Sequence, residues 1–156
     1  MIADKLVALR RRAGMSQQEV ARAIGVSRQT VSNWELAQGA PALDKAAELA
    51  RLFGVTIDDL ARDDVEIMAA RGPAAPRDVH VLRALVGRTA TVELSDQVLS
   101  EATILEVGEV WLRVSCEIKR AAFGRPKVER ARTVRLIDLG EVCAIVMDGP
   151  DADGEA

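Results

Sequence analysis

The spacing of apolar residues changes about midway along this 156-residue chain. Up to about residue 61 they recur three and four positions apart, which is typical of amphipathic helices. From residue 89 onward they alternate with polar residues, which is typical of strands that bury one face. The pattern therefore predicts an α+β chain of two domains: an all-α domain of five helices over residues 1–62, followed by a small antiparallel β-barrel or bent sheet.

Signals for helix ends are clearest around the second and third expected helices. Ser16 and Glu19 form a capping box that begins one helix, and Gly25 ends it because glycine adopts the left-handed conformation cheaply. Ser27 caps the next helix, which buries Trp34. The five expected helices cover about residues 3–13, 16–24, 27–35, 43–53 and 56–61.

The second half begins with an expected linker over residues 63–77, where Gly72, Pro73 and Pro76 break any periodicity. A short helix over residues 77–86 is expected to turn Val79, Leu82, Leu85 and Val86 inward. The expected strands of the domain over 78–147 are Thr89–Leu94, Leu99–Val107, 110–118, Arg132–Leu139 and Val142–Met147. Trp111 falls on the polar face of its strand, and an exposed indole often marks an interface. Residues 148–156 are acidic and small, and we expect them to be disordered.

Charge is distributed unevenly along the chain. Residues 1–62 carry nine Lys or Arg and seven Asp or Glu, a net charge of +2, whereas residues 63–156 carry a net charge of −5. The first half has only two lysines, Lys5 and Lys45, so the phosphates of a nucleic-acid ligand would have to be bound by amides, backbone N–H groups and a few arginines. This balance favours a binder that pairs with a second copy over a broad nonspecific binder of nucleic acid.

A basic segment interrupts the acidic second half between residues 119 and 135, where seven Lys or Arg accompany one acid. One interpretation is a solvated hairpin that pairs with acidic neighbours. The other is a second anionic contact, to DNA, RNA or an acidic patch on another subunit. The candidates for this contact are Lys119, Arg120, Arg125, Lys127 and Arg130.

Other residue types narrow the functional class. Cys116 and Cys143 lie in apolar, strand-like runs, which predicts buried free thiols in a reducing cytoplasm. No apolar run approaches the roughly 18 residues that cross a bilayer, and no signal peptide is evident. The single histidine, His80, has no metal-ligand or catalytic spacing around it, and there is no glycine-rich phosphate loop. We therefore expect a cytoplasmic protein that is not an enzyme and has no metal, no cofactor and no membrane partner.

Residues 1–61 resemble the lambda-repressor/Cro family of helix-turn-helix proteins, the Xre-type regulators. The resemblance is carried by short motifs at the family's spacing: Leu9-Arg10, Gly14-Met15-Ser16-Gln17, Val20-Ala21, Gly25-Val26-Ser27, Val31-Ser32-Asn33-Trp34-Glu35, Gly39, Pro41, Leu49-Ala50 and Phe53-Gly54-Val55. The start of the second half, Leu85-Val86-Gly87-Arg88-Thr89, resembles an Sm-like or other SH3-like small barrel. The first resemblance implies double-stranded DNA as the partner.

In this family the third helix reads base edges and the start of the second helix grips phosphate. Arg28 has the planar fork that pairs with guanine, Gln29 has the amide that pairs with adenine, and Thr30 offers a methyl group to thymine. The resemblance also implies a structural pair, Arg10 and Glu35, between the first and third helices. The implied DNA-binding residues are Gln17, Gln18, Ser27, Arg28, Gln29, Thr30, Ser32 and Asn33.

Together these features predict a sequence-specific DNA-binding transcriptional regulator, a dimeric repressor that inserts its third helix in the major groove. We expect residues 78–147 to form a homodimer or higher homo-oligomer, with ligand or partner sensing as a second role. Two alternatives are a protein-interaction adaptor that reuses the helix-turn-helix fold and an RNA-associated small-barrel protein. The second half has only two aromatic residues, Trp111 and Phe123, which counts against base stacking on RNA.

Overall fold

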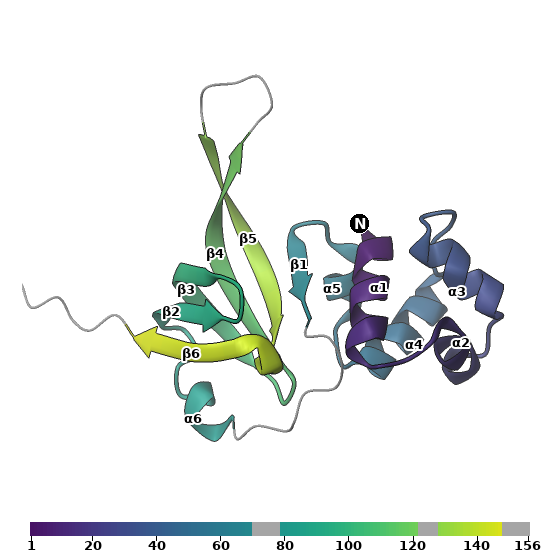
Figure 1. Cartoon of the computed structure of the whole chain (residues 1–156), viewed down its shortest axis with the longest axis horizontal. Coiled ribbons are helices and arrows are strands. Elements are labelled where there is room, and N and C mark those ends of the chain that lie inside the picture. The colour runs from purple at the N-terminus through teal and green to yellow at the C-terminus, as the bar shows by residue number, and fades with distance from the viewer. Residues whose placement is uncertain (70–78, 122–127, 148–156) are drawn as a thin grey trace, which may run out of the picture. The chain divides into compact units, whose positions relative to one another are not determined.

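The computed structural model describes residues 1–69, 79–121 and 128–147 (Figure 1). The chain divides into two compact units, Met1–Ala75 and Pro76–Ala156. The α+β organisation predicted from the sequence is confirmed. Within the described residues, every helix is too short or too polar to span a bilayer.

The first unit consists of five helices and one short strand. They are α1 (Ile2–Arg12), α2 (Gln17–Ile24), α3 (Arg28–Glu35), α4 (Leu43–Phe53), α5 (Ile57–Ala61) and β1 (Val65–Met68). Each helix lies within one or two residues of its expected range. The strand corrects the predicted linker over 63–77: Val65 is buried and β1 packs near α1, so this part of the segment belongs to the first unit. The rest of that linker, residues 70–77, lies outside the described residues.

Side chains close in sequence set the ends of α2 and α3. Ser16 Oγ accepts the N–H of Glu19 at 3.2 Å, and the Glu19 carboxylate accepts the N–H of Ser16 at 2.7 Å. Gly25 ends α2 in the left-handed conformation, with φ of 69°. Ser27 Oγ accepts the N–H of Thr30 at 3.1 Å and so caps α3. These bonds satisfy donors that a short helix leaves open, so the turn between α2 and α3 is encoded locally.

The core of the first unit gathers one apolar face from each helix. Among its deeply buried apolar side chains are Leu6, Leu9, Val20, Ala21, Ile24, Val31, Leu49 and Leu60. Lys5 is buried among them, and its Nζ donates to the carbonyl oxygen of Asp59 at 2.7 Å and to that of Arg62. Burial lowers the pKa of Lys5, although the negative charge of Asp63 opposes the shift. The ammonium group joins α1 to the last carbonyls of α5.

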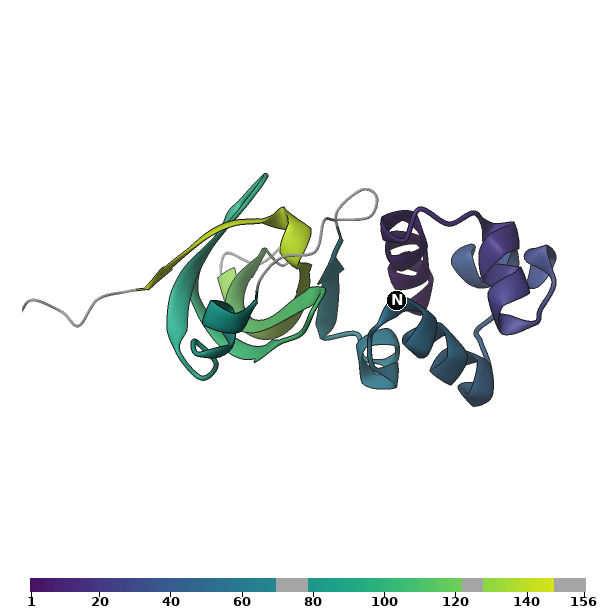
Figure 2. The ribbon, with the colours of Figure 1, turned by 90° about the horizontal axis from the view of Figure 1, so that it is seen from below.

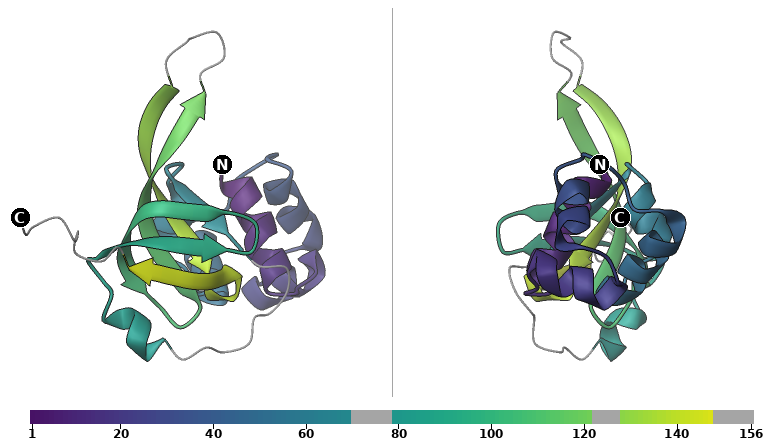
Figure 3. Two further views of the ribbon diagram at one scale, coloured as in Figure 1. Left: turned by 60° about the vertical axis from the view of Figure 1, so that its left-hand side comes forward. Right: turned by 90° about the vertical axis from the view of Figure 1, so that its right-hand side faces the viewer.

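The second unit contains a short helix and an antiparallel sheet. Its elements are α6 (His80–Arg83), β2 (Thr89–Leu94), β3 (Val98–Val107), β4 (Trp111–Ala121), β5 (Val128–Asp138), a 3₁₀ turn (Leu139–Glu141) and β6 (Val142–Met147). Within this unit the strand order is β5-β4-β3-β2-β6, and every neighbouring pair is antiparallel. Figures 2 and 3 show that the sheet curls strongly. The bent antiparallel sheet is therefore confirmed, whereas the resemblance to an Sm-like or SH3-like barrel stays a prediction.

Bulges account for much of the curl. The register shifts in three ladders, β2 with β3, β2 with β6 and β3 with β4. In the first of these, Ser100 and Glu101 of β3 together oppose the single residue Thr91 of β2. An extra residue on one strand increases the local twist and bends the sheet.

The helix predicted over 77–86 is wrong in length. Only His80–Arg83 are helical, and residues 77 and 78 lie outside the described residues. Val79 is buried and Leu82 and Leu85 are half-buried, but Val86 is 46% exposed. Gly87, with φ of 85°, turns the chain two residues before β2 begins.

Trp111 corrects the expectation of an exposed indole, because the residue is only 5% exposed. On the same face of the β4–β5 pair, Ser115 and Leu136 are buried too, while Leu112 and Val114 are buried on the opposite face. This part of the sheet is buried on both faces, so the alternation of apolar and polar residues along β4 does not predict which side chains are exposed there. A buried indole is unavailable for base stacking or for an interface.

The two cysteines differ in burial. Cys116 is buried, as predicted, but Cys143 is exposed, and neither forms a disulfide. β6, which carries Cys143, lies at one end of the strand order of this unit and also exposes Val146. A strand in this position has fewer neighbours to cover its side chains, so its apolar sequence alone does not bury it.

Candidate nucleic-acid interface

Helix α3 divides its side chains between a core face and a polar face. Val31 and Trp34 are 3% and 7% exposed and pack into the first unit. Arg28 and Gln29, in the first turn, are exposed, and Asn33 is half-buried one turn later. The helix therefore presents a guanidinium and amides side by side, groups that bind the edges of bases.

Hydrogen bonds within α3 order this polar face. Gln29 Nε2 donates to Asn33 Oδ1 at 2.8 Å, so the two amides form a pair one turn apart. The hydroxyl oxygens of Ser27 and Thr30 lie 2.8 Å from each other at the start of the helix. Each of these groups keeps further donor or acceptor capacity for a ligand.

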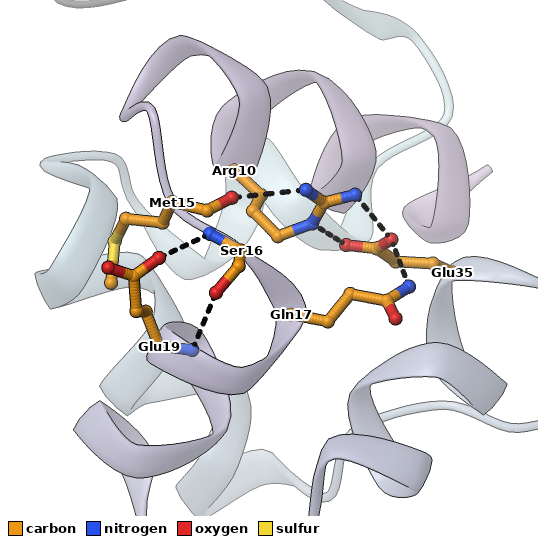
Figure 4. A network of polar contacts seen from close by, with 6 residues as sticks. All are labelled: Arg10, Met15, Ser16, Gln17, Glu19 and Glu35. Carbon is orange, nitrogen blue, oxygen red and sulfur yellow. Dashed lines mark hydrogen bonds and ion pairs between the residues drawn. The ribbon is translucent and has the colours of Figure 1, made fainter.

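A buried polar network holds α3 against α1 and α2 (Figure 4). Arg10 Nε and Nη2 donate to the two carboxylate oxygens of Glu35, at 2.5 and 2.9 Å. Arg10 Nη1 also donates to the Met15 carbonyl oxygen at 3.1 Å, and Gln17 Nε2 donates to Glu35 Oε2 at 2.9 Å. The bidentate geometry fixes both the distance and the rotation of α3 relative to α1.

Burial makes this pair energetically important. The side chains of Arg10 and Glu35 are only 16% and 6% exposed. Desolvation by burial would raise the pKa of Glu35, but hydrogen bonds from Arg10 and Gln17 outweigh it and hold that pKa below its usual range. The hydrogen bond to Glu35 raises the pKa of Arg10. Both groups are therefore charged at neutral pH.

The side chain of Gln17, one of the DNA-binding residues that the resemblance implied, is hydrogen-bonded within the first unit. Its side-chain amide is engaged by Glu35, so it joins the buried network at the start of α2. Gln18, the next residue, is exposed. Sequence patterns did not predict the Gln17–Glu35 bond, because the two residues are eighteen positions apart.

The two lysines of the first unit are both bound to backbone carbonyls. Lys5 is the buried group described above, and Lys45 Nζ donates to the Ile24 carbonyl oxygen at 2.8 Å and to Glu48. Lys45 thereby caps the end of α2 from α4, a role that sequence reasoning missed. The expectation that phosphate contacts come from other groups stays a prediction.

The basic segment of the second unit lies largely outside the described side chains. The structure gives backbone but no side-chain description for Lys119 and Arg120, while Arg125 and Lys127 fall within residues 122–127, outside the described residues. Arg130 is exposed and lies 3.8 Å from Glu117. This pair agrees with the solvated hairpin but leaves the second anionic contact a prediction.

No cluster of three or more His, Cys, Asp or Glu side chains that could hold a metal ion occurs among the described residues. His80 is exposed on the short helix α6.

The helix-turn-helix family model matches residues 6–60, the stretch that contains α2, α3 and the Arg10–Glu35 pair. Among proteins with curated descriptions, none matches the sequence. Similar solved structures include the P22 c2 repressor in complex with a synthetic operator, at 22% identity, covering 38% of this chain and 91% of that chain, with a TM-score of 0.38. A transcriptional regulator from Listeria innocua is 27% identical, covering 38% of this chain and 56% of that chain, with the same TM-score.

A third solved structure is of a different class. Hydroxypropylphosphonic acid epoxidase from S. wedmorenis is 10% identical, covering 98% of this chain and 92% of that chain, with a TM-score of 0.38. TM-scores of this size support no inference about this chain. The assignment of residues 6–60 to the helix-turn-helix family therefore depends on the family model alone.

Proposed function

Because residues 6–60 belong to the helix-turn-helix family of the lambda-repressor type, we propose that this chain is a sequence-specific DNA-binding transcriptional regulator that acts as a dimeric repressor in the cytoplasm. The observation that carries the proposal is the polar face of α3, held by the buried Arg10–Glu35 pair. A recognition helix must keep a fixed angle to the rest of its domain if several of its side chains are to contact bases at once. A buried bidentate ion pair between that helix and α1 supplies this rigidity.

The proposed base contacts begin with Arg28, whose exposed guanidinium can bind O6 and N7 of a guanine. The linked amides of Gln29 and Asn33 form a second reading group suited to adenine. Ser27, Thr30 and Ser32 complete the proposed face at the start and middle of α3.

Phosphate is proposed to bind at the start of α2. The first N–H groups of a helix have no carbonyl one turn earlier to bind, and the helix dipole favours an anion there. Gln18 is the exposed side chain at this position. Gln17 contributes its backbone N–H, while its side chain positions Glu35.

A dimer would supply affinity to a module that has only two lysines, both of them bound to backbone carbonyls. Two recognition helices about 34 Å apart would read half-sites one turn of B-DNA apart. The second unit is the proposed association domain.

The experiment is selection of bound sites from a random duplex pool, followed by binding of the winner to Arg28→Ala and Arg83→Ala. Both variants lose one arginine, but Arg83 lies on α6 in the second unit. Arg28→Ala should cost about 1–3 kcal/mol and relax preference at one base pair per half-site. Arg83→Ala should keep the preference of the parent.

Equal losses of affinity for the selected duplex in Arg28→Ala and Arg83→Ala would contradict base recognition by Arg28. Failure to enrich any duplex would favour the protein-interaction adaptor. An enriched site without two-fold symmetry would overturn the dimer.

A further inference from the structure

The far end of the β4–β5 pair extends as a two-stranded ribbon beyond the strands β2, β3 and β6 (Figures 1 and 3). The register between β3 and β4 ends at Ser115, whereas the register between β4 and β5 continues to Ala121. Among the described residues, β4 therefore pairs with β5 and no longer with β3 from Cys116 onward. We call Cys116–Ala121 and Val128–Thr133 the ribbon.

The segment that contains the ribbon is basic, although the second half of the chain is acidic. Residues 116–133 carry six Lys or Arg and two Glu, a net charge of +4. The remaining residues of the range 63–156 carry a net charge of −9. A local excess of positive charge attracts a polyanion to that part of a surface even when the whole chain is acidic.

Two cationic residues lie directly opposite each other in the ribbon. Lys119 of β4 pairs with Arg130 of β5. Residues in this relation share one face of the sheet, with Cβ atoms about 4.5–5.5 Å apart, and like charges there destabilise the pair of strands. An anion bound at this face would relieve the repulsion, so the arrangement favours a ligand with closely spaced negative charges.

The same face carries a third cation and one acid. Arg132 is exposed, and its Nε donates to Ser115 Oγ at 3.0 Å, which uses one of the five N–H donors of the guanidinium. Glu117 lies opposite Arg132 in the register and 3.8 Å from Arg130. Arg130 and Glu117 are both more than half exposed, so their ion pair contributes little. One carboxylate among three cations leaves this face with a net charge of +2.

The other face of the ribbon has no such excess of charge. Cys116 and Thr133 are buried there, and Ile118 is half-buried. Arg120 lies opposite Glu129 in the register, and opposite charges in this relation attract each other. The net positive charge of the ribbon is therefore concentrated on the face of Lys119 and Arg130.

We propose that this cationic face, which carries Lys119, Arg130 and Arg132, binds the phosphates of double-stranded DNA. DNA carries one negative charge per roughly 1.7 Å of helix axis and so supplies closely spaced anions. The major groove of B-DNA admits a two-stranded ribbon, whereas the major groove of an RNA duplex is too deep and narrow for side chains to read. Contacts to phosphate position a protein without reading base sequence. That the ribbon assists α3 rests on the proposed function, whereas its binding to a duplex does not.

The test measures how the affinity of the full-length protein for DNA depends on salt. The probe is a fluorescently labelled duplex of random sequence, titrated by fluorescence polarisation between about 50 and 200 mM NaCl. Arg130→Gln should reduce the slope of log K against log salt concentration by about 1, and the double variant with Arg132→Gln by about 2. The reason is that each lost phosphate contact releases about one counterion fewer.

Control variants separate charge from fold. Arg88→Gln removes an exposed arginine of the same unit outside the ribbon and should keep the wild-type slope. Arg130→Lys keeps the charge and should restore that slope. Arg130→Gln should not lower Tm, because it removes the repulsion from Lys119. This variant keeps the test decisive if Arg132→Gln, which gives up the bond to Ser115, fails to fold.

Three results would overturn the proposal. The first is a slope that Arg130→Gln leaves unchanged, including the case in which sedimentation shows a smaller assembly and the ribbon therefore contacts an acidic surface of a second copy. The second is an equal reduction of the slope in Arg88→Gln. The third is a reduction seen only with an RNA duplex of the same length.

The contact can fail or succeed separately from the proposed regulator function. Ribbon variants should weaken binding to the selected duplex and to unrelated duplexes alike, whereas Arg28→Ala should change the preference between them. A chain that binds random duplexes through the ribbon but selects no site would contradict only the regulator function. A chain that selects a site while Arg130→Gln keeps the wild-type slope would contradict only the ribbon contact.

Discussion

At the scale of single residues, Glu35 is the point on which the polar network of the first unit converges. It accepts three hydrogen bonds from two side chains, Arg10 and Gln17, while only 6% of its own side chain is exposed. A carboxylate in this position is stable only while its partners remain, and each partner is stable only while the carboxylate remains. The network is therefore a sensitive place to test the fold of the candidate interface.

Replacement of Glu35 by glutamine should destabilise the first unit by about 3 kcal/mol, because it leaves the Arg10 guanidinium largely buried without an anion. Each unit holds one tryptophan, so Trp34 fluorescence in a Trp111→Phe background reports urea unfolding of the first unit alone. Glu48→Gln is the matched control, since it removes a half-exposed partner of Lys45 and should cost less than about 1 kcal/mol. Similar losses of stability in Glu35→Gln and Glu48→Gln would show that the buried network stabilises the first unit no more than a surface ion pair does.

Acid should weaken the first unit partly through Glu35. A carboxyl group whose pKa is lower in the folded state stabilises that state above its unfolded pKa, about 4.3, and loses this contribution as pH falls through the folded pKa. The stability gap between wild type and Glu35→Gln should therefore be wide at pH 7 and narrow below about pH 4. Urea unfolding at the two pH values measures the gap, and a constant gap would refute the assignment.

At the scale of elements, the turn between α2 and α3 depends on the φ of 69° at Gly25. A methyl group added there would meet no atom within 4 Å, so any loss of stability is purely conformational. Gly25→Ala should cost about 1 kcal/mol. Gly39→Ala is the control, because its added methyl would make an ordinary contact, 3.8 Å from Trp34, at a glycine without a positive φ. Thermal unfolding that ranks the two variants in the reverse order would contradict this account.

Elements differ in how well their sequence predicts their environment. The helices of the first unit were predictable because caps and apolar spacing act within four residues, as at Ser16 and Glu19. The strands were placed well along the chain, but the burial of Trp111 and the exposure of Cys143 were not predicted. Those properties depend on what covers a face or an edge, which a period of two does not encode.

At the scale of the whole molecule, the proposed dimer makes a prediction about the two units. A fragment of residues 1–75, which retains β1 with the helices, should sediment as a monomer and lose most of the affinity for the selected site. The full-length chain should sediment as a dimer or higher oligomer at micromolar concentration. Analytical ultracentrifugation of both proteins decides the matter, and a fragment that still dimerises would move the association surface into the first unit.

The sequence by itself determined the helix-turn-helix domain, its caps and the polar face of α3, because each of these arises from residues a few positions apart. It also determined that the second half is a sheet, since alternation is a local property. Only the tertiary structure decided that Gln17 binds Glu35, that Lys45 caps α2, and that Arg135 donates to Gln97. These contacts join residues that lie far apart in the chain, and only the folding of the backbone brings them together.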